Sequence, residues 1–456
     1  MKNKANIILV TCLPVGMARY TLLVTVSILF LASNSLALSL QDSIDTALKN
    51  NPAVVASRKK VEAADARLAQ AVGAFFPTIK IDGNYGRSYN QPAVTQMTTQ
   101  TSLGAVTQTM TFGIDAAQDS KGYSASFSQP LFVGALIPGF AIAQRSADLI
   151  KEDLRRSVLD ISYNVTTAYF GVLKAAKMVK LAQESKQMAD SHYDQVGSMV
   201  SAGVATRADL LRAIVQQANS EVVLTRAKNG LEIAKDAFNN ALGRRLEEAV
   251  DLDEVGSVGA VAKLPEYKFI LDKSYQCRPE WKQYQLSKEI GEQNLRVAQL
   301  AYLPMVMLNG SSGNRVTEYP TFKTDVNSWS ITGAASWTLF DGLGIQNRIR
   351  EAAANLDAQK ATEEQVKSGI ALEVRDAYLN LKSALETIGS AKKAVDSAQE
   401  NYKVSSLRYS SGVGTNIEEL DAQVSLTQAK INYLQTVFDV EIAKAKINKL
   451  VGLEVL

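Results

Sequence analysis

The sequence predicts a mainly α-helical chain that carries four β-strands of membrane type and consists of two tandem copies of one structural unit. Three observations support this fold class: a short turn that occurs twice, two long apolar seams with heptad spacing, and two pairs of strands in which apolar and polar residues alternate. Such a chain is expected to be one protomer of a trimer, because four strands cannot close a barrel alone.

The repeated turn occupies residues 201–211 and again residues 410–420. Each copy has a glycine that ends one helix, a threonine that caps the next helix, and an acidic residue three positions later that completes a capping box. These residues are Gly203, Thr206 and Asp209 in the first copy and Gly412, Thr415 and Glu418 in the second. The recurrence indicates a duplicated helical hairpin.

The rest of the chain follows the same duplication. The first repeat, 38–243, is expected to contain a helix over 41–75 that bends or restarts at Pro52, strands 77–87 and 121–132 around a polar loop, a long helix 140–200 and a helix 206–242. A linker or equatorial segment spans 244–276. The second repeat, 277–456, is expected to contain a helix over 280–303, strands 304–313 and 328–340, a long helix 343–409 and a helix 415–450.

Both long helices carry apolar residues at alternating steps of three and four, which is typical of helices packed side by side. In the first helix these residues are Ile161, Val165, Ala168, Val172, Ala175, Val179, Ala182, Ala189 and Tyr193. The second helix has Ile370, Val374, Ala377, Leu381, Ala384, Ile388, Ala391, Val395, Ala398 and Tyr402. Because a helix of about 65 residues is about 100 Å long, we expect a tall coiled-coil α-barrel rather than a compact domain.

The strands fit a bilayer because one face is apolar and the other polar. Ile79, Ile81 and Tyr85 alternate with Lys80 and Asp82 in the first strand, and the other three strands follow the same rule. Three copies of the chain would supply a 12-stranded β-barrel with an aqueous bore. A soluble sandwich edge is the alternative for these strands.

Composition argues against other functions. The formal net charge is only +3, with 49 basic and 46 acidic residues, so no nucleic-acid partner is expected. Cys12 and Cys277 are the two cysteines, and no phosphate-binding glycine loop is present. The one histidine, His192, is expected at a surface or groove rather than as a catalytic base. We therefore expect no enzyme, no cofactor and no metal site.

The N-terminus is typical of a secretory signal peptide, residues 1–37. Arg19 precedes an apolar run from Tyr20 to Leu31, and small residues favour cleavage after Ala37. An uncleaved anchor is the alternative, although the run is shorter than the ~20 residues of a membrane-spanning helix. Met17 is a second possible start of translation.

With these features the mature chain resembles the TolC-like outer-membrane efflux protein family nearly end to end. The resemblance rests on the duplicated element order, the two turns, and the motifs that flank the strands, which are Phe76-Pro77, Tyr302-Leu303-Pro304, Pro130-Leu131-Phe132 and Leu339-Phe340-Asp341-Gly342. It implies a homotrimer with its β-barrel in the outer-membrane lipid and its α-barrel crossing the periplasm. It also implies a periplasmic adaptor protein, an inner-membrane transporter, and passive conduction of efflux or type I secretion substrates.

The resemblance further implies a periplasmic gate with acidic side chains after the second turn, matched here by Glu418 and Asp421. Three protomers would place six such carboxylates around one bore, although Glu418 also has a capping role. Asp209 and Tyr409 match members of a polar latch between the hairpins. One family example has an arginine in the second turn where this chain has Gly414, and Arg207 or Arg212 could replace it.

The exposed turn residues are the expected contact with the adaptor, with plain capping as the alternative role. They are Gly203, Val204, Ala205, Thr206, Gly412, Val413 and Thr415. A coiled-coil structural envelope protein or adhesin is the competing function, but such a protein needs no matched pairs of alternating strands between its helices.

Overall fold

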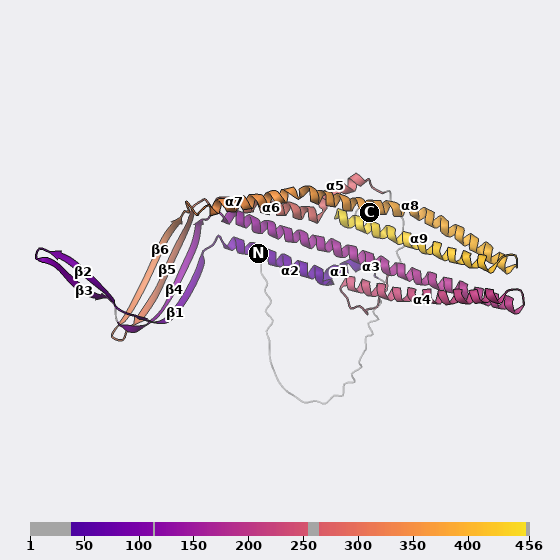
Figure 1. The fold of residues 1–456 in the computed structure, drawn as a ribbon, viewed down its shortest axis with the longest axis horizontal. Helices are drawn as coiled ribbons and strands as arrows, with labels where there is room; N and C mark the ends of the chain where they lie inside the picture. The colour runs from indigo at the N-terminus through magenta and orange to yellow at the C-terminus, as the bar shows by residue number, and fades with distance from the viewer. Residues whose placement is uncertain (1–37, 113–114, 254–263, 453–456) are drawn as a thin grey trace, which may run out of the picture.

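A computed structural model of the protein describes residues 38–112, 115–253 and 264–452. The predicted signal peptide, its cleavage site after Ala37 and the possible start at Met17 lie outside these residues. The molecule is elongated, with a β-sheet at one end, helices along the rest of its length, and two helical turns at the other end (Figure 1). None of the helices in the described ranges is both long and apolar enough to cross a lipid bilayer.

Nine helices are described, and they divide between the two halves of the chain. The first half contains α1 (Leu40–Asn50), α2 (Pro52–Gly73), α3 (Leu136–Ser201) and α4 (Arg207–Leu242). The second half contains α5 (Tyr267–Cys277), α6 (Pro279–Leu300), α7 (Gly344–Ala361), α8 (Glu363–Ser410) and α9 (Asn416–Val451). The predicted break at Pro52 is a new helix start, because Asn51 caps α2 by accepting a hydrogen bond from the backbone N–H of Ala53 at 2.9 Å.

The duplication extends further than the sequence predicts. Helix α5 begins and ends 227 residues after α1 (40 to 267 and 50 to 277), and α6 stands in the same relation to α2 (52 to 279 and 73 to 300). The predicted linker 244–276 therefore contains most of a helix of the second repeat. Helix α5 packs against α8 and α9, as α1 packs against α3 and α4.

The long helix predicted over 343–409 is two consecutive helices in the structure. The structure divides this helix at Thr362, between α7 and α8. The hydroxyl of Thr362 donates a hydrogen bond to the backbone oxygen of Gln359 at 2.7 Å, and side chains that bond to their own helix in this way commonly bend it. The first long helix, α3, is continuous over 66 residues.

Four antiparallel strands form the sheet in the order β1-β4-β5-β6, and a separate hairpin contains β2 and β3. The bounds are β1 Thr78–Asn90, β2 Ala93–Thr101, β3 Gly104–Phe112, β4 Ala116–Phe132, β5 Met305–Glu318 and β6 Lys323–Ser336. The predicted polar loop 88–120 is therefore wrong in its described part, which is largely extended. Threonine and valine favour strands in this segment even though it lacks a strict hydrophobic alternation.

The sheet has the two faces that the sequence predicts. Ile79, Phe127, Gly310 and Ile331 lie in one row across the four strands, and Ile79 and Ile331 are 72% and 66% exposed. The opposite face carries serine, threonine, asparagine and lysine. The apolar face is uncovered within one protomer, as expected for a surface that contacts lipid.

Gly313 in β5 is required by close packing of the sheet. A Cβ atom there would lie 2.5 Å from the backbone oxygen of Tyr123 and 2.9 Å from the Cα of Ser124. Gly313→Ala is therefore expected to destabilise the sheet by about 1–3 kcal/mol, the usual cost of overpacking. Thermal unfolding of the purified protein measures this loss. Gly333→Ala in β6 is the matched control because no atom lies within 4 Å of its added Cβ; equal melting temperatures would contradict the prediction.

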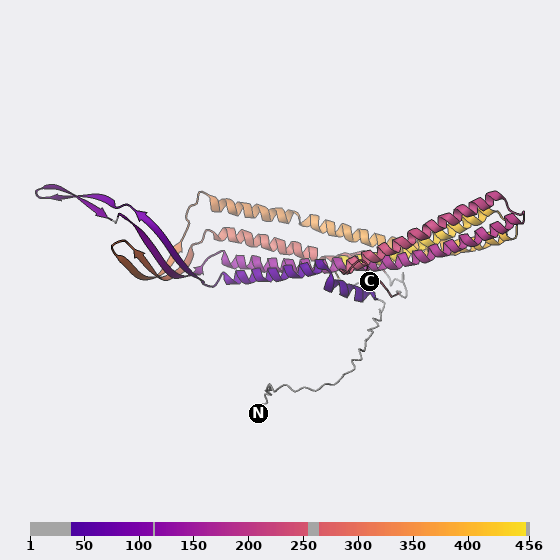
Figure 2. The same ribbon diagram turned by 90° about the horizontal axis from the view of Figure 1, so that it is seen from below.

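The helical body has its two largest apolar cores midway along its length. One is built on Tyr169, Phe170 and Phe238, and the other on Ile270, Leu381 and Ile447. Beyond these cores the α3–α4 and α8–α9 hairpins run together towards the tips (Figure 2). The two hairpins contact each other through α3 and α9. This contact positions the residues of the candidate site.

Candidate functional site at the hairpin tips

The two hairpin turns have the local structure that the sequence predicts. Gly203 and Gly412 both have φ of 75°, the left-handed region that glycine adopts without strain. Both capping boxes are present: the Thr206 hydroxyl oxygen accepts from the backbone N–H of Asp209, and the Thr415 hydroxyl oxygen accepts from that of Glu418, each at 3.2 Å.

The predicted tip residues form an exposed end surface. All of Gly203, Val204, Thr206, Gly412, Val413 and Thr415 are exposed, and Ala205 is half-buried. Val204 and Val413 are 69% and 72% exposed, so each hairpin presents one apolar side chain at its end.

The predicted gate residues, Glu418 and Asp421, are both exposed near the start of α9. Besides its capping bonds, Glu418 has an Oε2 atom 3.9 Å from Nη2 of Arg408. The residue that follows it in sequence behaves differently: Glu419 is only 2% exposed and points into the contact between the hairpins.

A buried polar cluster joins the two hairpins, and Asn416 lies at its centre. The Nδ2 group of Asn416 donates to both the backbone oxygen and the Oδ1 atom of Asp209, each at 3.2 Å. Its Oδ1 atom lies 2.7 Å from Nε2 of His192. An amide oxygen can only accept, so His192 carries a proton on Nε2. We call Asp209, His192, Asn416, Glu419 and Tyr409 the junction.

The charge state of the junction follows from this tautomer. The Nδ1 atom of His192 lies 3.3 Å from Oε2 of Glu419, and these two side chains are 2% and 3% exposed. Neither atom has another hydrogen-bond partner among the described residues. A proton on Nδ1 is placed to be donated to this carboxylate oxygen, so the buried carboxylate stabilises the charged imidazolium form of His192. Burial lowers the pKa of His192, but Glu419 and Asn416 raise it by more, and the net pKa is above the ordinary value.

Tyr409 packs on the same cluster. Its ring centroid lies 5.5 Å from that of His192, and its buried hydroxyl has no hydrogen-bond partner in the part of the chain that the structure describes. Burial raises the pKa of Tyr409, and the negative charges of Asp209 and Glu419 raise it further. The pKa of Asp209 is lowered, first by the hydrogen bond from the Thr206 hydroxyl and also by that from Asn416.

The structure thus brings both predicted latch residues, Asp209 and Tyr409, to one place without bonding them to each other. Nearest the tips, the two hairpins are linked through Asn416 and His192, which the sequence does not single out. The expectation that His192 lies at a surface or groove is wrong, because its exposure is 3%. The spacing of Asn416 and Glu419, three residues apart on one helix face, was the available signal.

The second turn has glycine at position 414, where one family example has arginine, because a larger residue would not fit there. A Cβ atom on Gly414 would lie 3.0 Å from both the Cβ of Arg408 and the backbone nitrogen of Tyr409, so the turn leaves little room for a side chain. Of the two suggested substitutes, Arg212 approaches the junction, with Nη1 3.6 Å from Oδ1 of Asp209. Arg207 is exposed at the start of α4.

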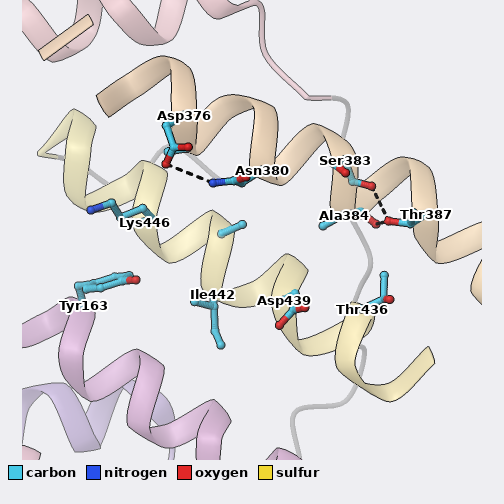
Figure 3. Close-up of a pocket in the computed structure, with 12 residues that line it drawn as sticks. Tyr163, Asp376, Asn380, Ser383, Ala384, Thr387, Thr436, Asp439, Ile442 and Lys446 are labelled. Carbon is cyan, nitrogen blue, oxygen red and sulfur yellow. Dashed lines mark hydrogen bonds between the residues drawn. The ribbon is translucent and has the colours of Figure 1, made fainter. Parts of the chain in front are cut away.

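A second polar feature lies near the middle of the molecule, where α3, α8 and α9 line a groove of about 550 Å³ (Figure 3). Lys446 in this groove pairs with Glu373 at 3.2 Å and lies over the ring of Tyr163. None of the predicted site residues lines it. Among the described residues, no group of three or more histidine, cysteine, aspartate or glutamate side chains is placed to hold a metal ion.

The duplicated hairpins, the two-faced sheet and the paired tips define a protomer of the outer-membrane channel type. The sequence profile of the family described as "Outer membrane efflux protein" matches residues 43–244 and 270–453. The chain belongs to this family, which confirms the resemblance found from the sequence.

Named relatives agree with this family. The chain is 23% identical to the outer membrane protein TolC of Salmonella enteritidis over 70% of its own length and 66% of that protein. It is 25% identical to TolC of Escherichia coli over 63% of its length and 59% of that protein, so it matches less than two thirds of either TolC chain. The alkaline protease secretion protein AprF of Pseudomonas aeruginosa is 24% identical over 93% of this chain and 86% of AprF.

Solved structures confirm the predicted fold class. The outer membrane protein VceC of Vibrio cholerae superposes with a TM-score of 0.74 at 16% identity, covering 91% of this chain and 96% of VceC. CusC gives a TM-score of 0.75 at 18% identity, covering 92% and 93%. The family and the named relatives place the protein in the outer membrane, with its helices extending into the periplasm.

Proposed function

We propose that the protein is the outer-membrane exit duct of a tripartite efflux or type I secretion system, and that it works as a homotrimer. The observation that carries this proposal is the protomer itself: helix α3, of 66 residues, leads from the uncovered sheet to one exposed hairpin tip, and α7 and α8 lead from it to the other. Its apolar sheet face needs a bilayer, and its two free sheet edges need neighbouring strands.

Reconstitution tests this function directly. The purified protein in a planar lipid bilayer is expected to give discrete ion-conducting events, and its mass in detergent is expected to be that of three chains. A coiled-coil spacer or adhesin would give no conductance under the same conditions, and that result would overturn the proposal.

The tips are the proposed contact with a periplasmic adaptor protein, which would link the duct to an inner-membrane transporter. The exposure of Val204 and Val413 supports this assignment, because each is an apolar side chain at the outer end of a hairpin. The relatives' names include alkaline protease secretion, cobalt-zinc-cadmium resistance and toluene efflux. This spread of names is expected if the inner-membrane partner selects the cargo.

Glu418 and Asp421 are proposed to form a carboxylate ring at the periplasmic mouth. We expect Glu418→Gln with Asp421→Asn to weaken block by a trivalent cation, raising the half-blocking concentration at least about tenfold, which corresponds to about 1.4 kcal/mol of binding free energy. Glutamine preserves the capping box. Block is measured on single channels in a planar bilayer.

The control for this experiment is Asp439→Asn, which removes an exposed acid from the same helix far from the tip. Its half-blocking concentration should stay that of the parent protein. If the double variant is blocked as strongly as this control, the carboxylate ring is wrong, whereas the exit-duct function is unaffected.

A further inference from the structure

The β2–β3 hairpin is amphipathic and stands beyond the sheet, at the end remote from the helices (Figure 1). Its register places Ala93 opposite Phe112, Thr95 opposite Met110, and Thr99 opposite Val106. The face defined by these pairs also contains Met97 and, opposite it, Gln108, and we call it the apolar hairpin face. The other face carries mainly threonine and glutamine, including Thr98 and Thr107, whose hydroxyl groups lie 3.0 Å apart.

The apolar hairpin face is uncovered in one protomer. Met97, Val106 and Phe112 are 58%, 56% and 58% exposed, and Met110 is 38% exposed. The hairpin pairs with no other strand of the described chain. An isolated two-stranded hairpin is at best marginally stable in water, so this one needs a partner surface.

Two observations favour other copies of the same hairpin as that partner. Residues 88–112 contain no charged side chain, so identical copies do not repel one another and no cation is available for a lipid phosphate. The hairpin also connects β1 to β4, and β1 is an edge strand of the sheet. The strand that is free to pair with a neighbouring protomer, β1, therefore continues directly into the hairpin.

We propose that the apolar hairpin faces of the three protomers pack against one another and form a cap over the outer mouth of the duct. This inference rests on the proposed trimer. Burial of methionine, valine and phenylalanine side chains would stabilise the cap by the hydrophobic effect. The threonine and glutamine face would then lie towards water, and the cap would narrow the opening.

Cysteine cross-linking tests the cap in the full-length, purified protein, in a Cys277→Ser background. Met97→Cys and Val106→Cys each place a thiol on the apolar hairpin face. Their matched controls, Thr98→Cys and Thr107→Cys, place one on the adjacent residue of the same strand but on the opposite face. After mild oxidation, the first two variants are expected to give covalent dimers on a denaturing gel and the controls to give none.

The outcomes separate the cap from the trimer on which it rests. The mass in detergent, measured before oxidation, reports the trimer independently, and a monomeric protein would overturn the proposed function itself. In a trimeric protein, equal cross-linking on both faces or none on either would overturn the cap. A fluorophore attached to the thiol of the Met97→Cys variant provides a further measurement. Its quenching by spin-labelled lipid in a phosphatidylcholine bilayer would assign the apolar face to the membrane instead, and would also overturn the cap.

Discussion

Replacing Asn416 by leucine is expected to open the tip end of the channel and to raise its single-channel conductance several-fold. Leucine is close to asparagine in shape but makes none of its three polar contacts to Asp209 and His192. Each buried polar group left without a partner costs about 1–3 kcal/mol. Because these contacts exist only while the two hairpins are together, their loss destabilises the joined arrangement and leaves a separated one unaffected.

The measurement is the conductance of the purified variant in a planar bilayer. Asn432→Leu is the matched control, since it makes the same change on α9 at a residue whose side chain, among the described residues, bonds within its own helix to Gln428. Each loss of about 1.4 kcal/mol shifts the ratio of open to closed channels about tenfold, so single-channel recording can detect the effect. Conductance equal to that of the control, in a variant with parental helix content, would remove the junction from the gating mechanism.

The features that the sequence predicts are those encoded by neighbouring residues. The capping boxes of Thr206 and Thr415 each depend on a side chain three positions later in the chain. The start of α2 depends on Pro52, whose ring suits the first position of a helix. The alternation along β1 and β4 fixes their two faces for the same reason. Local chemistry of this kind is sufficient for the element order, the duplication and the position of the hairpin tips.

The features that the sequence does not reveal depend on distant residues or on weak local patterns. His192 and Asn416 are 224 residues apart, and no pattern around either one indicates the other. Adjacent acids Glu418 and Glu419 look equivalent in sequence, yet only Glu419 turns into the α3–α9 contact. The threonine-rich segment over β2 and β3 lacks strict alternation, and the bend at Thr362 depends on a single hydroxyl group.

The junction also explains why one return helix begins with two acids and the other with one. Helix α4 begins with a single acid, Asp209, which is held by Thr206, Asn416 and Arg212. Helix α9 begins with Glu418 and Glu419, one exposed and one buried against His192. The two copies of the turn therefore contribute different groups to the junction. The first copy supplies the oxygen acceptors of Asp209, and the second supplies Asn416 and the buried carboxylate of Glu419.

Raising the pH through the neutral range is expected to weaken the junction and increase conductance, and His192→Gln is expected to abolish this dependence. The pKa of His192 in the folded protein is above its ordinary value, so the stabilisation from the protonated ring is fully present below the unfolded-state pKa of about 6.5. It is lost as the pH rises through the folded-state pKa. Conductance measured at steps from about pH 5 to pH 8 reports the change.

The groups around His192 whose pKa values are shifted keep their charge state in this range. Tyr409 and Tyr402 on α8 have raised pKa values and stay neutral, while Asp209 on α4 has a lowered pKa and stays charged. Glu419 on α9 is the carboxylate that faces Nδ1 of His192, at 3.3 Å. Since His192 is the single histidine of the chain, no second imidazole can mimic its effect. A parent protein whose conductance is constant over the range, or a glutamine variant with the same pH profile as the parent, would show that the junction does not respond to protons.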